Sequence, residues 1–195
     1  MSLEAIELFH GMSGCVEHLY CWTCAPDGTL LYSNCPDEQP LYTLFTSCGF
    51  VEKIRAYARD HDAPYALGTY MGLVWFSVLE KQDRVLKKIH LLGPVFHEPV
   101  QESEMETFLR DYETLGMKFT AKHILIGAMR QLPVIFRKTF GQLALMLHYC
   151  VNGERLSYHQ LAFLVDQELD EDKDTAPGLY RDIRLRTKEL TEYLR

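Results

Sequence analysis

The stretch "GLVWFSVLEKQDRVLKKIHLLGPV", residues 72–95, decides the fold class of this chain. It contains two runs rich in aromatic and branched residues, 72–80 and 85–95, separated by the polar segment "KQDR". Two such runs joined by a short polar turn predict an antiparallel β-hairpin. The pair Gly93-Pro94 is expected to close the second strand.

Shorter segments surround this hairpin. A second hairpin is predicted over 17–24 and 29–34, because Pro26, Asp27 and Gly28 supply turn chemistry between two aromatic-rich runs. A short strand is expected at "YALGT", residues 65–69. Helices are predicted over residues 3–12, 40–48, 50–61, 102–116, 120–131 and 134–151.

Two segments near the end of this region are less regular. The helix over 134–151 is apolar on nearly all sides, which predicts burial against the sheet or against a partner subunit. Residues 156–165 fit a strand or a helix equally well. The first 165 residues therefore predict an α+β domain, with an antiparallel sheet flanked by helices.

The last thirty positions predict a different kind of structure. Residues 166–178 form a charged linker with a Pro-Gly break, and residues 179–195 form an amphipathic helix. Its apolar positions follow a short heptad seam, Leu179, Ile183, Leu190 and Leu194, with Thr187 between. This spacing indicates a coiled-coil-like connector, and a helix packed on the domain is the alternative.

Length and charge exclude several classes of protein. With 195 residues, the chain has room for one domain and a helical appendage. No apolar run reaches the roughly 18–20 residues that span a bilayer, and no secretory signal begins the chain, so we expect a cytoplasmic protein without a membrane anchor. A net charge of −7 disfavours direct binding of DNA, whose phosphates attract Lys and Arg.

The cysteines raise the question of a metal or redox site. Cys21 and Cys24 have the two-residue spacing of a zinc knuckle or a redox pair. On a strand, however, residues three apart point to opposite faces, which predicts packing rather than chemistry. Cys35, just after the second strand, is the thiol expected to contact a ligand. A metal or redox sensor built on Cys15, Cys21, Cys24 and Cys35 stays open as an alternative.

No catalytic motif is present in the sequence. We find no nucleotide loop, nucleophile elbow or paired metal-binding histidines, and we therefore predict neither an enzyme, a cofactor nor a resident metal. His148 lies in the apolar helix and is expected to be a hydrogen-bonded core residue, whereas His97 follows the last strand and lies where it would line a pocket. The strand aromatics Trp22, Tyr32 and Trp75 fit a pocket wall or an ordinary sheet core.

Four stretches carry a resemblance to a known family: "LYSNCP", "GLVWFSVLE", "LLGPVFHEP" and "LPVIFRKTFGQLALMLHYCVNGE". They resemble the N-terminal sensory region of bacterial transcriptional regulators of the AraC type, over roughly residues 10–165. The order of the predicted elements also resembles PAS and GAF sensor domains, which fold an antiparallel sheet over a small-molecule pocket and signal through a terminal helix.

The resemblance implies a function and a set of partners. It implies an effector-sensing, dimerising regulatory domain that binds a small molecule. It supplies no binding residues, so strand position alone places the ligand on the concave face of the sheet, near Trp22, Tyr32, Cys35, Trp75 and His97. It also implies a homodimer that reaches DNA only through a separate helix-turn-helix domain, which this chain does not contain. A dimerisation module without a ligand is a further alternative.

Overall fold

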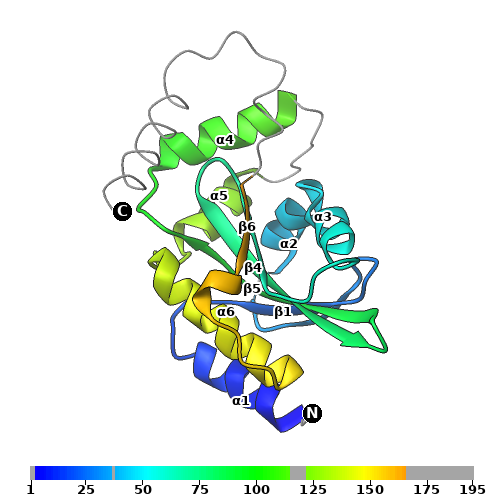
Figure 1. Cartoon of the computed structure of the whole chain (residues 1–195). Coiled ribbons are helices and arrows are strands. Elements are labelled where there is room, and N and C mark those ends of the chain that lie inside the picture. Colours follow the sequence, from blue (N-terminus) through cyan, green and yellow to red (C-terminus); the bar gives the residue numbers. More distant parts are fainter. Residues whose placement is uncertain (1–2, 37, 115–121, 166–195) are drawn as a thin grey trace, which may run out of the picture. The chain divides into compact units, whose positions relative to one another are not determined.

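The computed structural model describes residues 3–36, 38–114 and 122–165. Its centre is the antiparallel hairpin of β4 (Leu73–Gln82) and β5 (Val85–Phe96), which confirms the hairpin predicted over 72–95 (Figure 1). Asp83 and Arg84 form its two-residue turn, and both have positive φ, 52° and 64°. This is the turn geometry whose twist matches that of the two flanking strands.

Six strands form one sheet in the order β2-β1-β5-β4-β3-β6. The strands β1 (Cys21–Cys24) and β2 (Leu30–Ser33) form the second predicted hairpin, and β1 pairs antiparallel with β5. On the other side, β3 (Tyr65–Gly68) pairs antiparallel with β4. The last strand, β6 (Ala162–Val165), runs parallel to β3. The sheet is therefore mixed, and the predicted antiparallel arrangement holds for the first five strands only.

Helices cover both faces of the sheet (Figure 1). One face carries α1 (Leu3–Ser13) and α6 (Arg137–Asn152), and the other carries α2 (Glu38–Ser47) and α3 (Phe50–Tyr57). The helices α4 (Glu102–Thr114) and α5 (Lys122–Arg130) contact each other, and α5 also contacts α2. A short 3-10 helix, η1 (Tyr158–Gln160), connects α6 to β6. The crossover that parallel strands require is provided by the long segment between β3 and β6.

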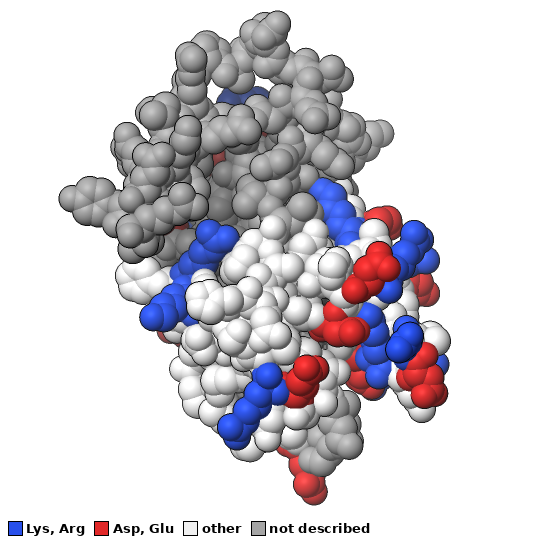
Figure 2. All heavy atoms as spheres, in the orientation of Figure 1, with Lys and Arg blue, Asp and Glu red and all other residues white. Residues whose placement is uncertain are grey.

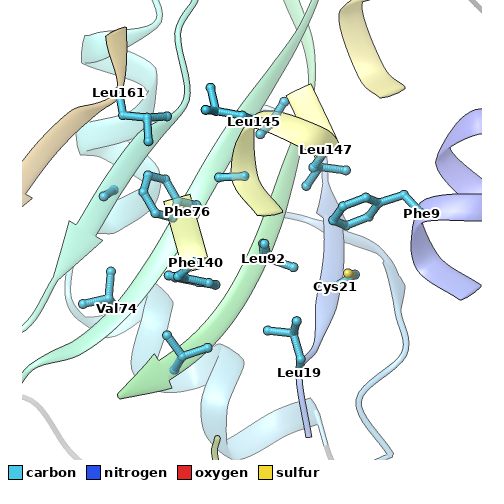
Figure 3. Packing of buried hydrophobic residues seen from close by; sticks show 14 of the residues in the cluster. Phe9, Leu19, Cys21, Val74, Phe76, Leu92, Phe140, Leu145, Leu147 and Leu161 are labelled. Carbon is cyan, nitrogen blue, oxygen red and sulfur yellow. The ribbon is translucent and has the colours of Figure 1, made fainter. Parts of the chain in front are cut away.

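A mostly aliphatic core lies between the sheet and the helices α1 and α6 (Figure 3). The helices contribute Phe9 of α1 and Leu147 of α6 to this core. The two central strands contribute Phe76 and Leu92. Helix α6 buries one face only, since Met146 and Tyr149 remain 43% and 48% exposed. The predicted burial against the sheet is therefore confirmed for the inner face of α6, while its outer face carries exposed apolar side chains.

Gly93 occupies the point where β5 crosses under α6. Its φ is +105°, and a Cβ there would lie 2.9 Å from the carbonyl oxygen of Val74 and 3.1 Å from Cζ of Phe140. Its N–H donates to the carbonyl of Tyr20, and its own carbonyl accepts from Nε1 of Trp22. Only glycine satisfies both the conformation and the space, which explains the "LLGPV" stretch in physical terms.

Residues 1–165 form one unit of the chain. The predicted linker, 166–178, and the predicted connector helix, 179–195, lie outside the described residues. None of the helices in the described ranges is both long and apolar enough to cross a bilayer.

Candidate functional site

The face of the sheet under α2 and α3 is filled with aromatic rings. Trp22 stacks on Tyr42 with ring centroids 5.8 Å apart, and Trp75 lies 5.7 Å from Phe45 and 5.6 Å from Phe50. Both tryptophans are at most 2% exposed. Since helix side chains already occupy the space above them, these two residues form a sheet core rather than the wall of an open pocket.

A cleft opens at the end of this aromatic layer, where the chain enters β1. Its volume is about 340 Å³, within the range of small-molecule sites. The described lining comes from three places: the approach to β1, the segment after β2 with α2, and one side of α5. The lining residues are His18, Tyr20, Cys35, Pro36, Leu41, Ile124, Gly127, Ala128 and Gln131.

Polar side chains converge at one end of the cleft. Nδ1 of His18 lies 3.1 Å from the hydroxyl of Tyr20, and the Cys35 thiol is the next polar neighbour of that hydroxyl. Burial raises the pKa of Tyr20, and the neighbouring Cys35 raises it further. Tyr20 is therefore a neutral hydroxyl at physiological pH, able to donate or accept a hydrogen bond.

Local backbone contacts hold these polar residues in place. His18 has a φ of +59°, and the turn before β1 is closed by the N–H of Leu19 donating to Val16. After β2, the Asn34 side chain accepts from the N–H of Cys21, and the hydroxyl of Ser33 accepts from the N–H of Cys35. The two ends of the first hairpin are thus fixed side by side, which brings Cys35 next to Tyr20.

The opposite wall is apolar and comes from α5. Ile124 and Ala128 are four residues apart and share a face of that helix, together with Gly127. Gln131, just after the helix, supplies an amide. The described lining contains no Lys, Arg, Asp or Glu, so the cleft suits an uncharged molecule with an apolar body and a hydrogen-bonding end.

Of the five residues predicted as a binding site, the described structure brings Cys35 to the cleft. Trp22 and Trp75 lie in the neighbouring core, on the same side of the sheet. Tyr32 and His97 lie on the other side: Tyr32 stacks on His10 of α1, and Nδ1 of His97 lies 2.9 Å from the carbonyl of Ile135. The five residues therefore do not form one site.

Cys21 and Cys24 point to opposite faces of the sheet. Sγ of Cys21 lies 3.2 Å from the hydroxyl of Ser13 in α1, while Cys24 approaches the carbonyl of Ile89 and the side chain of Tyr42. Burial raises the pKa of each thiol to about 11, so both are protonated at neutral pH and poorly suited to ligation or exchange. Within the described ranges, no three His, Cys, Asp or Glu side chains are grouped to hold a metal.

Sequence reasoning missed most of the cleft. The alternation of side chains along the strand "LYCW" places Tyr20 on the same face as Trp22. The two rings meet edge to face, with centroids 6.2 Å apart. Strand alternation is therefore a signal from which the position of Tyr20 follows. No comparable signal indicated Ile124 or Gln131, because α5 reaches the cleft from more than eighty positions along the chain.

Comparison with known proteins adds no relative: no family model, no curated protein and no solved structure matches this chain.

Proposed function

We propose that this chain is an effector-sensing, dimerising regulatory domain of a bacterial transcription factor, and that the effector binds in the cleft beside β1. The observation that carries the proposal is the convergence of Tyr20, His18 and Cys35 at one end of a cleft whose opposite wall is apolar. DNA binding would then belong to a separate helix-turn-helix domain, as the family resemblance implies.

The position of the cleft supports a sensory role. Its walls come from separate segments, the β1–β2 hairpin with α2 on one side and α5 on the other. A molecule that fills the space contacts all of them at once and stabilises their mutual arrangement. Binding that favours one arrangement over another is the physical requirement for a signal. The absence of charged groups in the described lining favours a small, uncharged effector.

The hairpin geometry supports the sensory proposal over the cysteine-based alternative. Two of the four cysteines considered for a metal or redox sensor, Cys21 and Cys24, point to opposite sides of the sheet, and burial raises the pKa of both thiols. Cys35 is placed at the cleft, where it can contact an organic ligand.

Native mass spectrometry of the purified chain tests the proposal. We expect an adduct of small mass that is lost on mild denaturation, and that mass identifies the effector. Ala128→Leu, which fills the cleft from α5, should lower adduct occupancy at least several-fold, because the added side chain takes the ligand's space.

Ala56→Leu is the matched control, because Ala56 is an exposed alanine on α3, away from the cleft. Its occupancy should equal that of the unmodified chain. The proposal is contradicted if no adduct is found and a panel of small uncharged compounds leaves the melting temperature unchanged, or if both variants retain the adduct equally.

A further inference from the structure

Exposed apolar side chains gather on the outer sides of α1 and α6. Leu8 and Met12 on α1 are 65% and 51% exposed, and Met146 and Tyr149 on α6 are 43% and 48% exposed. We call these four residues and the helices that carry them the α1/α6 surface. The two helices contact each other, so their outer sides are neighbours. Monomeric proteins rarely leave large apolar patches exposed unless they serve an interaction.

Charged residues are sparse where α6 faces the viewer in Figure 2 and crowd instead toward the tip of the β4–β5 hairpin. Phe163 of β6 is 37% exposed and lies beside α6. The guanidinium carbon of Arg137 lies over the Phe163 ring, 4.2 Å from the ring centroid. This face of the molecule therefore carries few charged side chains, and cationic ones lie along part of its border (Figure 2).

The two helices carry charges of opposite sign. Helix α1 has two acids, Glu4 and Glu7, and no Lys or Arg. Helix α6 begins with Arg137 and Lys138 and has no Asp or Glu, and Arg155 follows it, over the ring of Tyr149.

These charges are available to a partner. Glu154, which precedes Arg155 in the sequence, has a carboxylate oxygen 3.9 Å from Nε2 of His148. Over the ranges that the structure describes, no ion pair involves Glu4, Glu7, Lys138 or Arg155.

We propose that the α1/α6 surface binds a second copy of this chain, with α1 of each copy lying on α6 of the other. In a two-fold interface the contact of one helix on the other occurs twice. The acids of α1 then face the bases of α6 at both places, and the apolar rows of the four named residues become buried. Packing α1 on α1 would instead oppose acid to acid, which disfavours that arrangement.

This inference rests on the dimer in the proposed function and not on the effector. It assigns the dimer to a surface on the face of the sheet opposite to α2 and α3. A chain that dimerises through this surface but binds no small molecule would leave the interface standing and overturn the sensory function. The two proposals therefore fail separately.

Charge exchange between two variants tests the interface on the full chain. One variant carries Glu4→Lys and Glu7→Lys, and the other carries Lys138→Glu and Arg155→Glu. Each variant alone has like charges at both contacts. The dissociation constant of its dimer, measured by sedimentation equilibrium, should therefore rise at least about tenfold. An equimolar mixture should restore the dimer, because each positive α1 then meets a negative α6.

Glu52→Lys with Asp60→Lys is the control, since both acids are exposed on the α2/α3 side and the change in net charge equals that of the first variant. It should dimerise as the unmodified chain does. Circular dichroism melts verify that all variants fold, and Met146→Glu gives an independent disruption of the apolar row. The inference is overturned if the unmodified chain is monomeric at high concentration, if the charge variants dimerise normally, or if mixing them restores nothing.

Discussion

The two faces of the sheet differ in what they bury. The α2/α3 face holds a buried aromatic cluster around Trp22 and Trp75. The α1/α6 face is mainly aliphatic but also buries histidines, among them His90 and His148. Neighbouring residues of one strand, Trp75 and Phe76, thus enter two chemically different cores. The histidines whose pKa is lowered by burial therefore lie on one face, and the densest aromatic packing lies on the other.

Both ring nitrogens of His90 have a hydrogen-bonding partner. Nδ1 lies 3.1 Å from the hydroxyl of Thr23, and Nε2 lies 2.9 Å from a carboxylate oxygen of Glu80, which Lys88 also approaches. Burial lowers the pKa of His90, against the opposing effect of Glu80. Burial is also the main cause that lowers the pKa of His10, His97 and His148. All four of these residues belong to the α1/α6 side.

The largest effect is expected on the aromatic face. Trp75→Ala should lower the free energy of unfolding by about 3–5 kcal/mol, because it removes a ring that is 1% exposed and contacts Phe45 and Phe50. Urea denaturation measures it. If the cost is below about 1 kcal/mol, the cluster is loosely packed and the contrast between the faces disappears.

A smaller effect should arise where both faces meet, at Gly93. Gly93→Ala should cost about 1–3 kcal/mol, because the residue has φ of +105° and its Cβ would approach Val74 and Phe140. Thermal unfolding reports the change. Gly11→Ala is the control: this glycine lies within α1 with nothing near its missing Cβ, so the substitution should stabilise by about 0.5–1 kcal/mol. Equal outcomes for the two glycines would contradict the crossing geometry.

The smallest effect is the pH dependence. Burial lowers the pKa of these histidines in the folded chain, whereas in the unfolded chain a histidine has its ordinary pKa, near 6.5. As the pH falls through about 6.5, the unfolded chain therefore binds more protons than the folded chain. Stability should therefore decrease from about pH 7 to pH 5, by at most about 1.4 kcal/mol per pH unit for each histidine. His90→Gln should reduce this slope in denaturation measured across that range.

His123→Gln serves as the comparison for that measurement, since it makes the same substitution at an exposed histidine of α5. A slope that persists fully in His90→Gln would assign the proton uptake to the other three histidines. A stability independent of pH would contradict the difference between the two faces.

Regular elements were the predictable part of the fold. The two hairpins and the helices at 50–57 and 102–114 follow from alternation, turn residues and one-sided apolar patterns. The sequence does not distinguish strand from helix at 162–165, because four apolar residues fit either, and only the pairing with β3 decides. His148 is buried as predicted, yet only half satisfied: Asn152 reaches Nδ1, and Nε2 has no hydrogen-bond partner among the described residues.

The candidate site was less predictable than the fold. Strand positions of Trp22 and Trp75 could be inferred, but whether helices or a ligand fill the space above them depends on how α2 and α3 pack. Cys35 was identified because it follows a strand end. The apolar wall from Ile124 and Ala128 depends on a contact between distant helices, which periodicity alone does not encode.

The pairing of β1 with β5 has a consequence for the order in which the chain folds. Trp75 contacts Phe45 and Phe50, which lie within thirty positions of it in the sequence. Nε1 of Trp22, in contrast, donates a hydrogen bond to the carbonyl of Gly93, 71 positions away. Closing the longer loop costs more entropy, and contacts between distant positions form more slowly. During synthesis the edge of β1 that pairs with β5 stays unpaired until β5 has emerged, although Tyr42 of α2 is available earlier to cover Trp22. The aromatic contacts are therefore expected to form early, and the pairing of β1 with β5 late.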